Sequence, residues 1–242
     1  MIDIHTHILP GIDDGASGVE EAVEMTALLH EQKIHAAVCT PHFDPGNMTL
    51  EDFISRRTYA MSLMGAARII LIPASETQYH EYLFHYPDLS GLCMGNSRYL
   101  LLELPFQRKW EKPLFQGIEK LMNYYDCIPV IAHIERYPAA NRRNIKHLLE
   151  MGCLLQLNAS ALLNRGQEKM ALRMIREDRI ALLGSDCHNR SVRPPLLLPA
   201  YEIVKEKLGI EYRKKLEFNS EAVIKNVDIR NIDGYQAYRL NL

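Results

Sequence analysis

The sequence has no apolar run of the roughly 18 residues that a membrane-spanning helix needs. Its first residues include neither a basic segment nor the apolar core of a secretory signal, so we expect a soluble, unexported, cytoplasmic protein. It has no basic block and no aromatic-basic stripe, so nothing indicates nucleic acid as a main partner. The cysteines are odd in number and lie mostly in or beside apolar runs, which indicates reduced thiols rather than a disulfide framework. They are Cys39, Cys93, Cys127, Cys153 and Cys187.

Length and composition are those of one globular domain. The chain has 242 residues, of which 47% are hydrophobic and 24% are charged, and its formal net charge is -2. A chain of this size buries a full core. We find no linker and no internal repeat, and we expect a single domain over residues 1–242. Residues 227–242 read as a C-terminal extension whose packing the pattern does not define.

Apolar runs of strand length alternate with helical patterns along the whole chain. The expected strands are residues 2–5, 35–40, 69–74, 99–104, 128–133, 153–158 and 180–184. Helices are expected after a capping box at Ser17-Gly18-Val19-Glu20, from Pro113 to Tyr125, and over residues 50–64, 145–149, 162–175 and 201–208. Each strand is thus followed by a crossover helix, which predicts a parallel α/β fold whose strands are buried on both faces.

Two short segments at opposite ends of the chain each offer metal-ligand side chains two residues apart. His5 and His7 follow the first apolar run, and Asp186 and His188 follow the last one. Residues two apart on a strand point to the same side, so each pair can hold one ion or two neighbouring ions. The alternative for either pair is a purely structural role, in which the strand-end side chains form hydrogen bonds with the backbone or with water.

Further candidate ligands stand at the ends of the other strands. They are the Asp13-Asp14 pair after the first strand, His42 after the second, Glu76 after the third, Glu103 at the end of the fourth and His133 after the fifth. A closed or nearly closed parallel barrel would bring all these ends to one rim. Burying several carboxylates beside several imidazoles is unfavourable without cations, so the pattern predicts a polynuclear metal site.

Four segments carry a resemblance to a known family. They are residues 3–16 (DIHTHILPGIDDGA), 40–43 (TPHF), 132–137 (AHIERY) and 184–189 (GSDCHN). This set resembles the signature of the polymerase and histidinol phosphatase (PHP) superfamily, and most closely its bacterial protein-tyrosine phosphatase branch of the CpsB/YwqE type. That branch is found with capsule and exopolysaccharide synthesis. The similarity extends from Met1 to about Leu208.

The resemblance implies a distorted seven-stranded (β/α)7 barrel, similar to a TIM barrel, that holds three divalent ions. The metal is commonly manganese, and iron and zinc also suit imidazole and carboxylate ligands. One ion would take His5, His7, Glu76 and Asp186; a second would share Glu76 and take Glu103 and His133; the third would take His42, His188 and Asp14, with Asp13 as a rival to Asp14. Arg136 and Arg193 match positions at which the family binds phosphate, and a guanidinium can hold two phosphate oxygens at once.

Charge supports a phosphate substrate independently of the resemblance. Three divalent ions exceed four ligand carboxylates by about two positive charges, which matches a phosphate dianion. A hydroxide bridging two ions would be available near neutral pH for in-line attack on phosphorus. A tyrosyl phenolate leaves with a pKa near 10, so the demand for a strong general acid is modest.

One apparent catalytic motif is rejected, and three alternative functions stay open. The spacing from Cys187 to Arg193 fits a thiol-dependent phosphatase, but its loop has no glycine and no helix N-terminus to lower the pKa of the thiol. The alternatives are a small-molecule phosphatase acting on a substrate such as histidinol phosphate, a metal-dependent amidohydrolase, and a metal-binding regulatory module. Amidohydrolases usually carry a lysine where this chain has Glu103.

The substrate is the least constrained part of the prediction. Loops over residues 44–49 and 77–92, with Phe43, Tyr79, Tyr82 and Phe84, could receive an aromatic phosphoester, or these rings could simply pack the loop down. The resemblance favours a phosphotyrosine protein, such as the C-terminal tail of a bacterial tyrosine kinase. A disordered tail can reach a recessed site that a folded surface cannot.

Overall fold

The strands of the computed structural model, which describes residues 1–231, pair only in parallel. One sheet has the order β1-β2-β4, and the other has the order β3-β5-β6-β7-β8-β9. The strands are β1 (Ile2–Thr6), β2 (Ala36–Cys39), β3 (His42–Phe43), β4 (Ile70–Pro73), β5 (Glu76–Gln78), β6 (Tyr99–Glu103), β7 (Ile128–Ile131), β8 (Leu154–Asn158) and β9 (Leu182–Gly184).

The two sheets are joined into one curled wall. After β9, the Asp186 amide donates to the His5 carbonyl and the His7 amide donates to the Cys187 carbonyl, both at 2.9 Å. Thr6 and Cys187 also form a parallel bridge. Residues 40–41 separate β2 from β3, and residues 74–75 separate β4 from β5, so the chain passes from one sheet to the other at these points.

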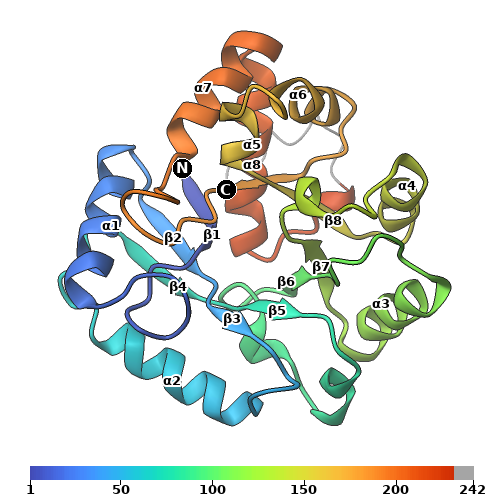
Figure 1. The fold of residues 1–242 in the computed structure, drawn as a ribbon, viewed down its shortest axis with the longest axis horizontal. Coiled ribbons are helices and arrows are strands. Elements are labelled where there is room, and N and C mark those ends of the chain that lie inside the picture. Colours follow the sequence, from blue (N-terminus) through green and yellow to red (C-terminus); the bar gives the residue numbers. More distant parts are fainter. Residues whose placement is uncertain (232–242) are drawn as a thin grey trace.

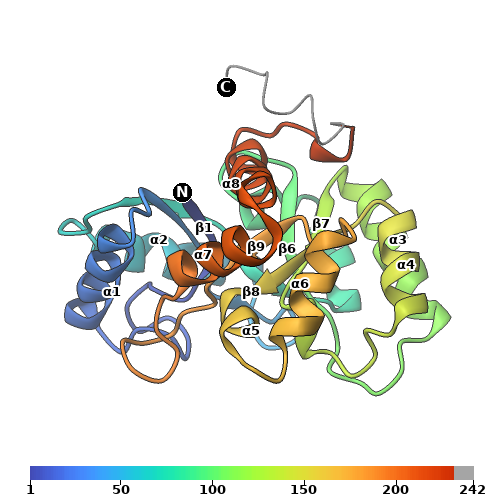
Figure 2. The same ribbon diagram turned by 90° about the horizontal axis from the view of Figure 1, so that it is seen from above.

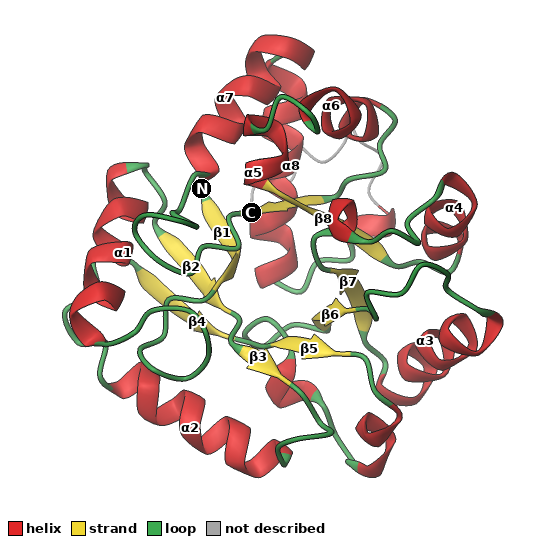
Figure 3. Ribbon diagram, in the orientation of Figure 1, coloured by secondary structure: helices red, strands yellow, loops and turns green. Residues whose placement is uncertain are grey.

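The first six α-helices lie between strands, as the alternating pattern predicts, and α7 and α8 follow the last strand. In chain order the α-helices are α1 (Val19–Glu31), α2 (Leu50–Ser62), α3 (Lys112–Tyr125), α4 (Arg142–Glu150), α5 (Ala159–Leu163), α6 (Glu168–Arg176), α7 (Leu197–Leu208) and α8 (Ile210–Ile224). The strands surround the centre of the molecule, and α1, α2, α3, α4, α6 and α7 lie outside them (Figures 1 and 3). Short 3-10 helices are η1 (Glu81–His85), η2 (Ser90–Leu92), η3 (Ile134–Arg136) and η4 (Ile229–Asn231). No helix within residues 1–231 is both long and apolar enough to cross a membrane.

The predicted parallel α/β fold is confirmed, and each of the seven predicted strands overlaps an observed one. The expected crossover helix is wrong between β5 and β6, where only η1 and η2 occur. Burial on both faces is wrong for β4, where Ile70 is 65% exposed. The reason is that β4 is the last strand of its sheet, and the connection that follows β5 contains no α-helix to cover it.

The capping box expected at the start of α1 is also wrong. The N-cap residue is Gly18, in an extended conformation and without a side-chain cap. The Ser17 amide and hydroxyl instead both donate to Oε2 of Glu21, at 3.0 and 2.7 Å. The helix still begins where the apolar periodicity begins, because Ala22, Met25 and Leu29 are buried against the core.

The sequence pattern missed α8, which packs against β1 and β9. Val223 of this helix joins the apolar cluster inside the curled sheet, and Asn219 Nδ2 donates to the Ala181 carbonyl at 2.9 Å. The following residues are held by Tyr99, whose hydroxyl donates to the Val227 carbonyl at 2.6 Å. Figure 2 shows α8 beside the strands, close to the N-terminus. Of the expected extension over residues 227–242, residues 232–242 lie outside the described part.

Candidate metal centre

The nine candidate ligands lie in strands or in the segments that follow them, with His42 and Glu76 at the first positions of the short strands β3 and β5, and the fold brings all nine into one cluster. Each has a donor atom within 3.5 Å of a donor atom of another member. The members are His5 in β1, His7 and Asp14 in the loop after β1, His42 in β3, Glu76 in β5, Glu103 in β6, His133 after β7, and Asp186 and His188 after β9. Parallel strands present their carboxyl ends to one rim, which explains why residues so far apart in sequence meet.

Four donor atoms form the centre of the cluster. His5 Nε2 lies 3.2 Å from His7 Nε2, 3.3 Å from Glu76 Oε2 and 3.5 Å from Asp186 Oδ1. His7 Nε2 lies 3.2 Å from Glu76 Oε2 and 3.5 Å from Asp186 Oδ1. All four side chains are buried, with exposed fractions of 3% or less.

Two further groups adjoin these four atoms. On one side, His133 Nε2 lies 2.6 Å from Glu76 Oε1 and 3.5 Å from Glu103 Oε1. On the other side, Asp14 Oδ1 lies 3.3 Å from His188 Nε2 and 3.4 Å from His42 Nε2. The groups overlap, because His42 Nδ1 also lies 3.1 Å from Glu76 Oε2, and donor atoms of His7, Asp14, His42 and His188 all lie within 4.8 Å of one another.

The spacing of these atoms fits metal coordination. Ligand bonds of about 2.1 Å place neighbouring ligands of one ion about 3.0–3.4 Å apart, depending on the coordination geometry. The central contacts of 3.2 to 3.5 Å lie close to that range. Most of them join two atoms that can each offer a lone pair to a metal ion. In addition, buried Asp186 Oδ1 and His188 Nε2 have no hydrogen-bond partner among the described residues. The residues present therefore fit a group of divalent cations.

Asp13 lies behind the cluster rather than in it. Its Oδ2 accepts from His7 Nδ1 at 2.8 Å and from the His42 amide at 3.1 Å, and its Oδ1 accepts from the Gly15 amide at 3.0 Å. A histidine whose Nδ1–H is held in this way keeps its Nε2 lone pair for a metal. Asp14, next in the chain, is the member of the pair that faces His42 and His188.

Strand β8 contributes two buried polar side chains that the sequence analysis missed. Gln156 Oε1 lies 3.2 Å from His5 Nδ1 and accepts from the His133 amide at 2.6 Å. Asn158 accepts from Gln156 Nε2 at 2.9 Å and donates to Asp186 Oδ2 at 2.8 Å. Their positions two apart in an otherwise apolar strand were the available signal. Together, Gln156 and Asn158 orient ligands from three other strand ends.

Two donors occupy strained backbone conformations. His133 has φ 32° and Asp186 has φ 52°, in the left-handed region that costs a non-glycine residue of order 1–2 kcal/mol. The bond from the His133 amide to Gln156 and the bond from the Asp186 amide to the His5 carbonyl hold these conformations. Such strain is common at functional sites.

Close approach of β1 to its neighbours requires glycine at two positions. A Cβ atom on Gly15 would lie 2.1 Å from the His7 carbonyl oxygen, and one on Gly184 would lie 2.6 Å from His5 Cβ. Beside them, fully buried Asp3 accepts from the Ser185 amide at 2.9 Å. Burial raises the pKa of Asp3 to about 6. These contacts fix the ends of β1 and β9 against each other.

The imidazoles take up protons when they alone balance the carboxylates. Burial lowers the pKa of His7, but hydrogen bonds and charge from Asp13 and Glu76 outweigh burial and raise this pKa to about 10. Burial likewise opposes protonation of His133, but hydrogen bonds to Glu103 and Glu76 raise its pKa to about 9. Divalent cations would have to displace these protons on binding.

The carboxylates of the centre are held ionised. Burial alone would raise the pKa of Asp186, but the charges of His5 and His7 lower it to about 2. The same neighbours outweigh burial at Glu76 and hold its pKa well below the usual range. Burial and the charge of His7 lower the pKa of His188 to about 4, so this imidazole is neutral at pH 7 and its Nε2 can act as a ligand.

The two predicted arginines meet at one oxygen of the cluster. Arg193 lies 2.6 Å and Arg136 lies 3.3 Å from Asp186 Oδ2. Their side chains are 36% and 42% exposed, so both guanidinium groups are accessible from solvent. The loop that carries Arg193 is tight, because Asn189 Oδ1 accepts three backbone amides, including that of Arg193 at 3.0 Å.

Cys187 lies within the cluster segment but is unsuited to nucleophilic attack. The residue is fully buried, and burial raises the pKa of its thiol well above the usual range. The amides of the loop that follows are already bonded to Asn189 rather than directed at an anion site. A catalytic cysteine needs an exposed, stabilised thiolate.

The loop aromatics that were considered for substrate contact mostly pack inward. Phe43 is 1% exposed and packs on Phe53, and Phe84 stacks on Tyr125. An exposed aromatic ring beside the cluster is instead Phe106, which the sequence analysis missed although it follows Glu103 by three residues. Phe106 is 50% exposed, its ring centroid lies 5.7 Å from that of His133, and the Arg136 guanidinium lies 5.3 Å from its ring.

A curled parallel sheet with clustered imidazoles and carboxylates at its carboxyl rim defines an α/β protein with a candidate polynuclear metal centre. The family model of CpsB/CapC, capsular polysaccharide synthesis, matches residues 1–225. The chain therefore belongs to the CpsB/CapC family.

Individual relatives agree with this assignment. The tyrosine-protein phosphatase CpsB of Streptococcus agalactiae is 28% identical over 242 residues, which cover 93% of this chain and 99% of the relative. The tyrosine-protein phosphatase YwqE of Bacillus subtilis is 28% identical over 245 residues, which cover 95% and 93% of the two chains. A crystal structure from work on YwqE of Bacillus subtilis and CpsB of Streptococcus pneumoniae, described as unique metal-dependent tyrosine phosphatases, matches with a TM-score of 0.80 and 25% identity, over 94% of this chain and 95% of that one.

Proposed function

We propose that this protein is a metal-dependent protein-tyrosine phosphatase. The observation that carries the proposal is the set of nine donors at coordination spacing with two guanidinium groups directed at one edge of the set. Family membership and the names of the relatives support the same activity. A divalent metal cluster that carries excess positive charge beside two arginines suits a phosphate dianion better than a neutral carbonyl compound.

The ligand assignment follows the contacts. His5, His7, Glu76 and Asp186 would hold one ion; Glu76 would be shared with a second ion held by Glu103 and His133; Asp14, His42 and His188 would hold a third. We infer manganese as the metal, with iron and zinc as alternatives that the same ligands accept. When bound, the ions would polarise phosphoryl oxygens and lower the pKa of water to about 7.

The protein's own groups would orient the substrate. Arg136 and Arg193 converge on Asp186 Oδ2 and are exposed on the other side, so they can bind phosphoryl oxygens without leaving the cluster. Asp13 and Gln156 would hold His7 and His5 by their Nδ1 atoms, which fixes both rings with Nε2 toward the centre. No buried general acid is required for a phenolate leaving group whose conjugate acid has a pKa near 10.

Phe106 supports an aromatic phosphoester. Its half-exposed ring contacts both the Arg136 guanidinium and the His133 ring, at the edge of the cluster. We infer that the ring of a phosphotyrosine stacks on Phe106 while its phosphate reaches the cluster. Aromatic pairs contribute about 0.5–1.5 kcal/mol beyond area burial. A phosphoserine has no ring to make this contact.

Finer aspects of the fold and setting are also proposed. We infer a distorted seven-stranded barrel in which β2 with β3, and β4 with β5, each count as one interrupted strand. We place the protein in the cytoplasm and propose that its substrate is a phosphotyrosine protein in capsule or exopolysaccharide synthesis, such as the C-terminal tail of a bacterial tyrosine kinase. The family description supports the pathway.

The proposal is tested with metal-stripped protein. Mn²⁺, Fe²⁺ or Zn²⁺ is added back, bound metal is measured, and kcat/KM is compared for a phosphotyrosine peptide, the matched phosphoserine peptide and histidinol phosphate. We expect metal-dependent turnover that strongly favours phosphotyrosine. A much higher kcat/KM on histidinol phosphate would reject the tyrosine-phosphatase assignment, and chelator-resistant turnover would reject the metal mechanism.

The role of Phe106 has its own test. Phe106→Ala should lower kcat/KM for the phosphotyrosine peptide about 3- to 10-fold, which corresponds to the loss of one aromatic pair. Turnover of the phosphoserine peptide should change little. Tyr82→Ala is the matched control, because Tyr82 is 48% exposed and contacts the rings of His80 and His85 rather than the cluster. An equal loss on both peptides would remove Phe106 from ring recognition.

A further inference from the structure

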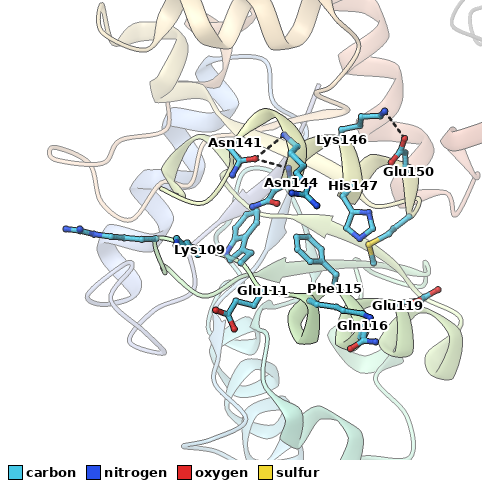
Figure 4. A pocket seen from close by; sticks show the side chains of 15 residues that line it. Lys109, Glu111, Phe115, Gln116, Glu119, Asn141, Asn144, Lys146, His147 and Glu150 are labelled. Atoms are coloured by element: carbon cyan, nitrogen blue, oxygen red, sulfur yellow. Dashed lines mark hydrogen bonds and ion pairs between the residues drawn. The ribbon is translucent and has the colours of Figure 1, made fainter.

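A groove of about 950 Å³ runs between α3 and α4, outside the metal cluster. The two helices lie side by side in Figures 1 and 2. The floor of the groove includes Trp110 and Phe115, which are 6% and 9% exposed. Figure 4 shows Phe115 and His147 facing each other across it, in an edge contact with ring centroids 4.7 Å apart. The groove thus has a packed aromatic floor and polar walls.

The end of the groove at the carboxyl rim of the strands is strongly cationic. Arg108, Lys109, Lys112 and Arg143 line it, all exposed, beside the single carboxylate of Glu111. Within residues 1–231, none of these four cationic side chains makes an ion pair or a hydrogen bond. The far end is closer to neutral, because Lys146 pairs with Glu150 at 3.4 Å and Glu119 lies on the opposite wall. A local positive field stands out on a chain of formal net charge -2.

The cationic end is continuous with the metal cluster through the loop after β6. Trp110 Nε1 donates to the Pro105 carbonyl at 3.0 Å, and its ring meets the edge of Tyr137 at 5.2 Å. Tyr137 in turn lies 4.9 Å from Phe106, which is 5.7 Å from His133. A few residues of extended chain, at about 3.3 Å per residue, would reach from the cluster to the groove.

We propose that this groove binds an acidic, extended segment of the substrate, in the part of the substrate chain next to the phosphotyrosine. The inference rests on the proposed function and adds a second recognition element to it. The four exposed cationic side chains would attract the acidic side chains, and the aromatic floor would contact the apolar parts of the segment. Acidic residues nearest the phosphotyrosine matter most, because the cations are concentrated at the rim end.

The test compares phosphotyrosine peptides that differ only in flanking charge. One peptide carries four Asp on the N-terminal side, one carries four Asp on the C-terminal side, and matched peptides carry Asn instead. At low salt we expect one of the two Asp peptides to have a kcat/KM about 10-fold above that of its matched Asn peptide. A few exposed ion pairs would account for a difference of this size. The ratio should fall toward one as salt rises, because the pairs are screened.

A charge-reversal pair assigns the preference to the groove. In Lys112→Glu/Arg143→Glu the Asp-to-Asn ratio should fall to one or below. The matched control is Lys207→Glu/Arg176→Glu, which changes the same residue types at exposed positions near the C-terminal ends of α7 and α6. Neither side chain has an ion pair with another described residue, and this variant should keep the wild-type ratio. The ratio within each variant corrects for any change in overall activity or folding.

Two results would overturn the proposal: a wild-type ratio of one, or a preference that survives in Lys112→Glu/Arg143→Glu. A second measurement, fluorescence anisotropy of a labelled acidic peptide without phosphate, should show binding that the same double variant loses. Turnover of the Asn peptide alone decides the proposed phosphatase activity. Failure of the groove and failure of the enzyme assignment are therefore distinguishable.

Discussion

Asp13 and Asp14 are neighbours in sequence, yet their exchange for asparagine should have different consequences. Asp13 is 6% exposed and bonds His7 Nδ1 at 2.8 Å from behind, whereas Asp14 is 65% exposed and directs Oδ1 toward His42 and His188. Asp13→Asn keeps an acceptor oxygen for His7 and removes only its charge. Asp14→Asn removes a proposed metal ligand.

The expected magnitudes follow from these positions. Loss of an outer-sphere partner of a ligating histidine typically lowers metal affinity 10- to 100-fold, or about 1.4–2.7 kcal/mol. Asp13→Asn should therefore bind the full complement of metal and regain activity, but at 10- to 100-fold higher free Mn²⁺. Asp14→Asn should bind one equivalent of Mn²⁺ less than the wild type. The proposed third metal site would keep only the imidazoles of His42 and His188 as ligands.

The assay measures metal content by mass spectrometry after dialysis against buffered Mn²⁺, together with kcat/KM as a function of free Mn²⁺. Asp52→Asn is the control, because Asp52 is exposed on α2 and has no side-chain contact with the cluster. The reverse pattern, with one equivalent missing in Asp13→Asn and full occupancy in Asp14→Asn, would refute the assignment and make Asp13 the ligand.

Three further outcomes are expected. Arg136→Ala should lose a few kcal/mol of transition-state stabilisation, measured as kcat/KM on a phosphotyrosine peptide, while metal content stays constant; unchanged kcat/KM would exclude Arg136 from phosphate binding. Cys187→Ser should retain most turnover and His5→Ala should lose nearly all of it, whereas iodoacetamide-sensitive, chelator-resistant activity would contradict both expectations. In metal-free protein the pKa of His7 is raised to about 10 and that of His133 to about 9, so both hold protons from their usual pKa near 6.5 up to those values. Metal must displace these protons, so affinity should rise with pH over that window, and calorimetry in buffers of different ionisation enthalpy should detect proton release; pH-independent affinity would argue against it.

Local pattern determined most of the strands, although it missed the short strands β3 and β5. Burial of apolar residues along a strand is a property of consecutive positions, so the predicted parallel α/β fold could be inferred from seven apolar runs. The same holds for side chains two apart, such as His5 with His7, which point to one side of a strand. Helix α8 escaped this reasoning because its contacts with β1 and β9 are made by a few residues, such as Val223 and Asn219, in a mostly polar helix.

Only the tertiary structure decided which of the strand-end residues lie close together. The choice between Asp13 and Asp14 depends on a turn that Gly15 brings against the His7 carbonyl. In the sequence Gln156 is a polar residue in a mostly apolar strand. In the structure its side chain contacts His5 and the His133 backbone amide, which come from the ends of two other strands.

The same is true of the groups around the cluster. Arg136 and Arg193 are far apart in sequence and meet at one oxygen of Asp186, and Phe106 lies beside them because the loop after β6 folds back over Tyr137. The sequence by itself therefore determined which residue types stand at the strand ends, since that depends on neighbours along the chain. Which atoms face one another was decided only by packing between strands, because those contacts join residues that no local pattern relates.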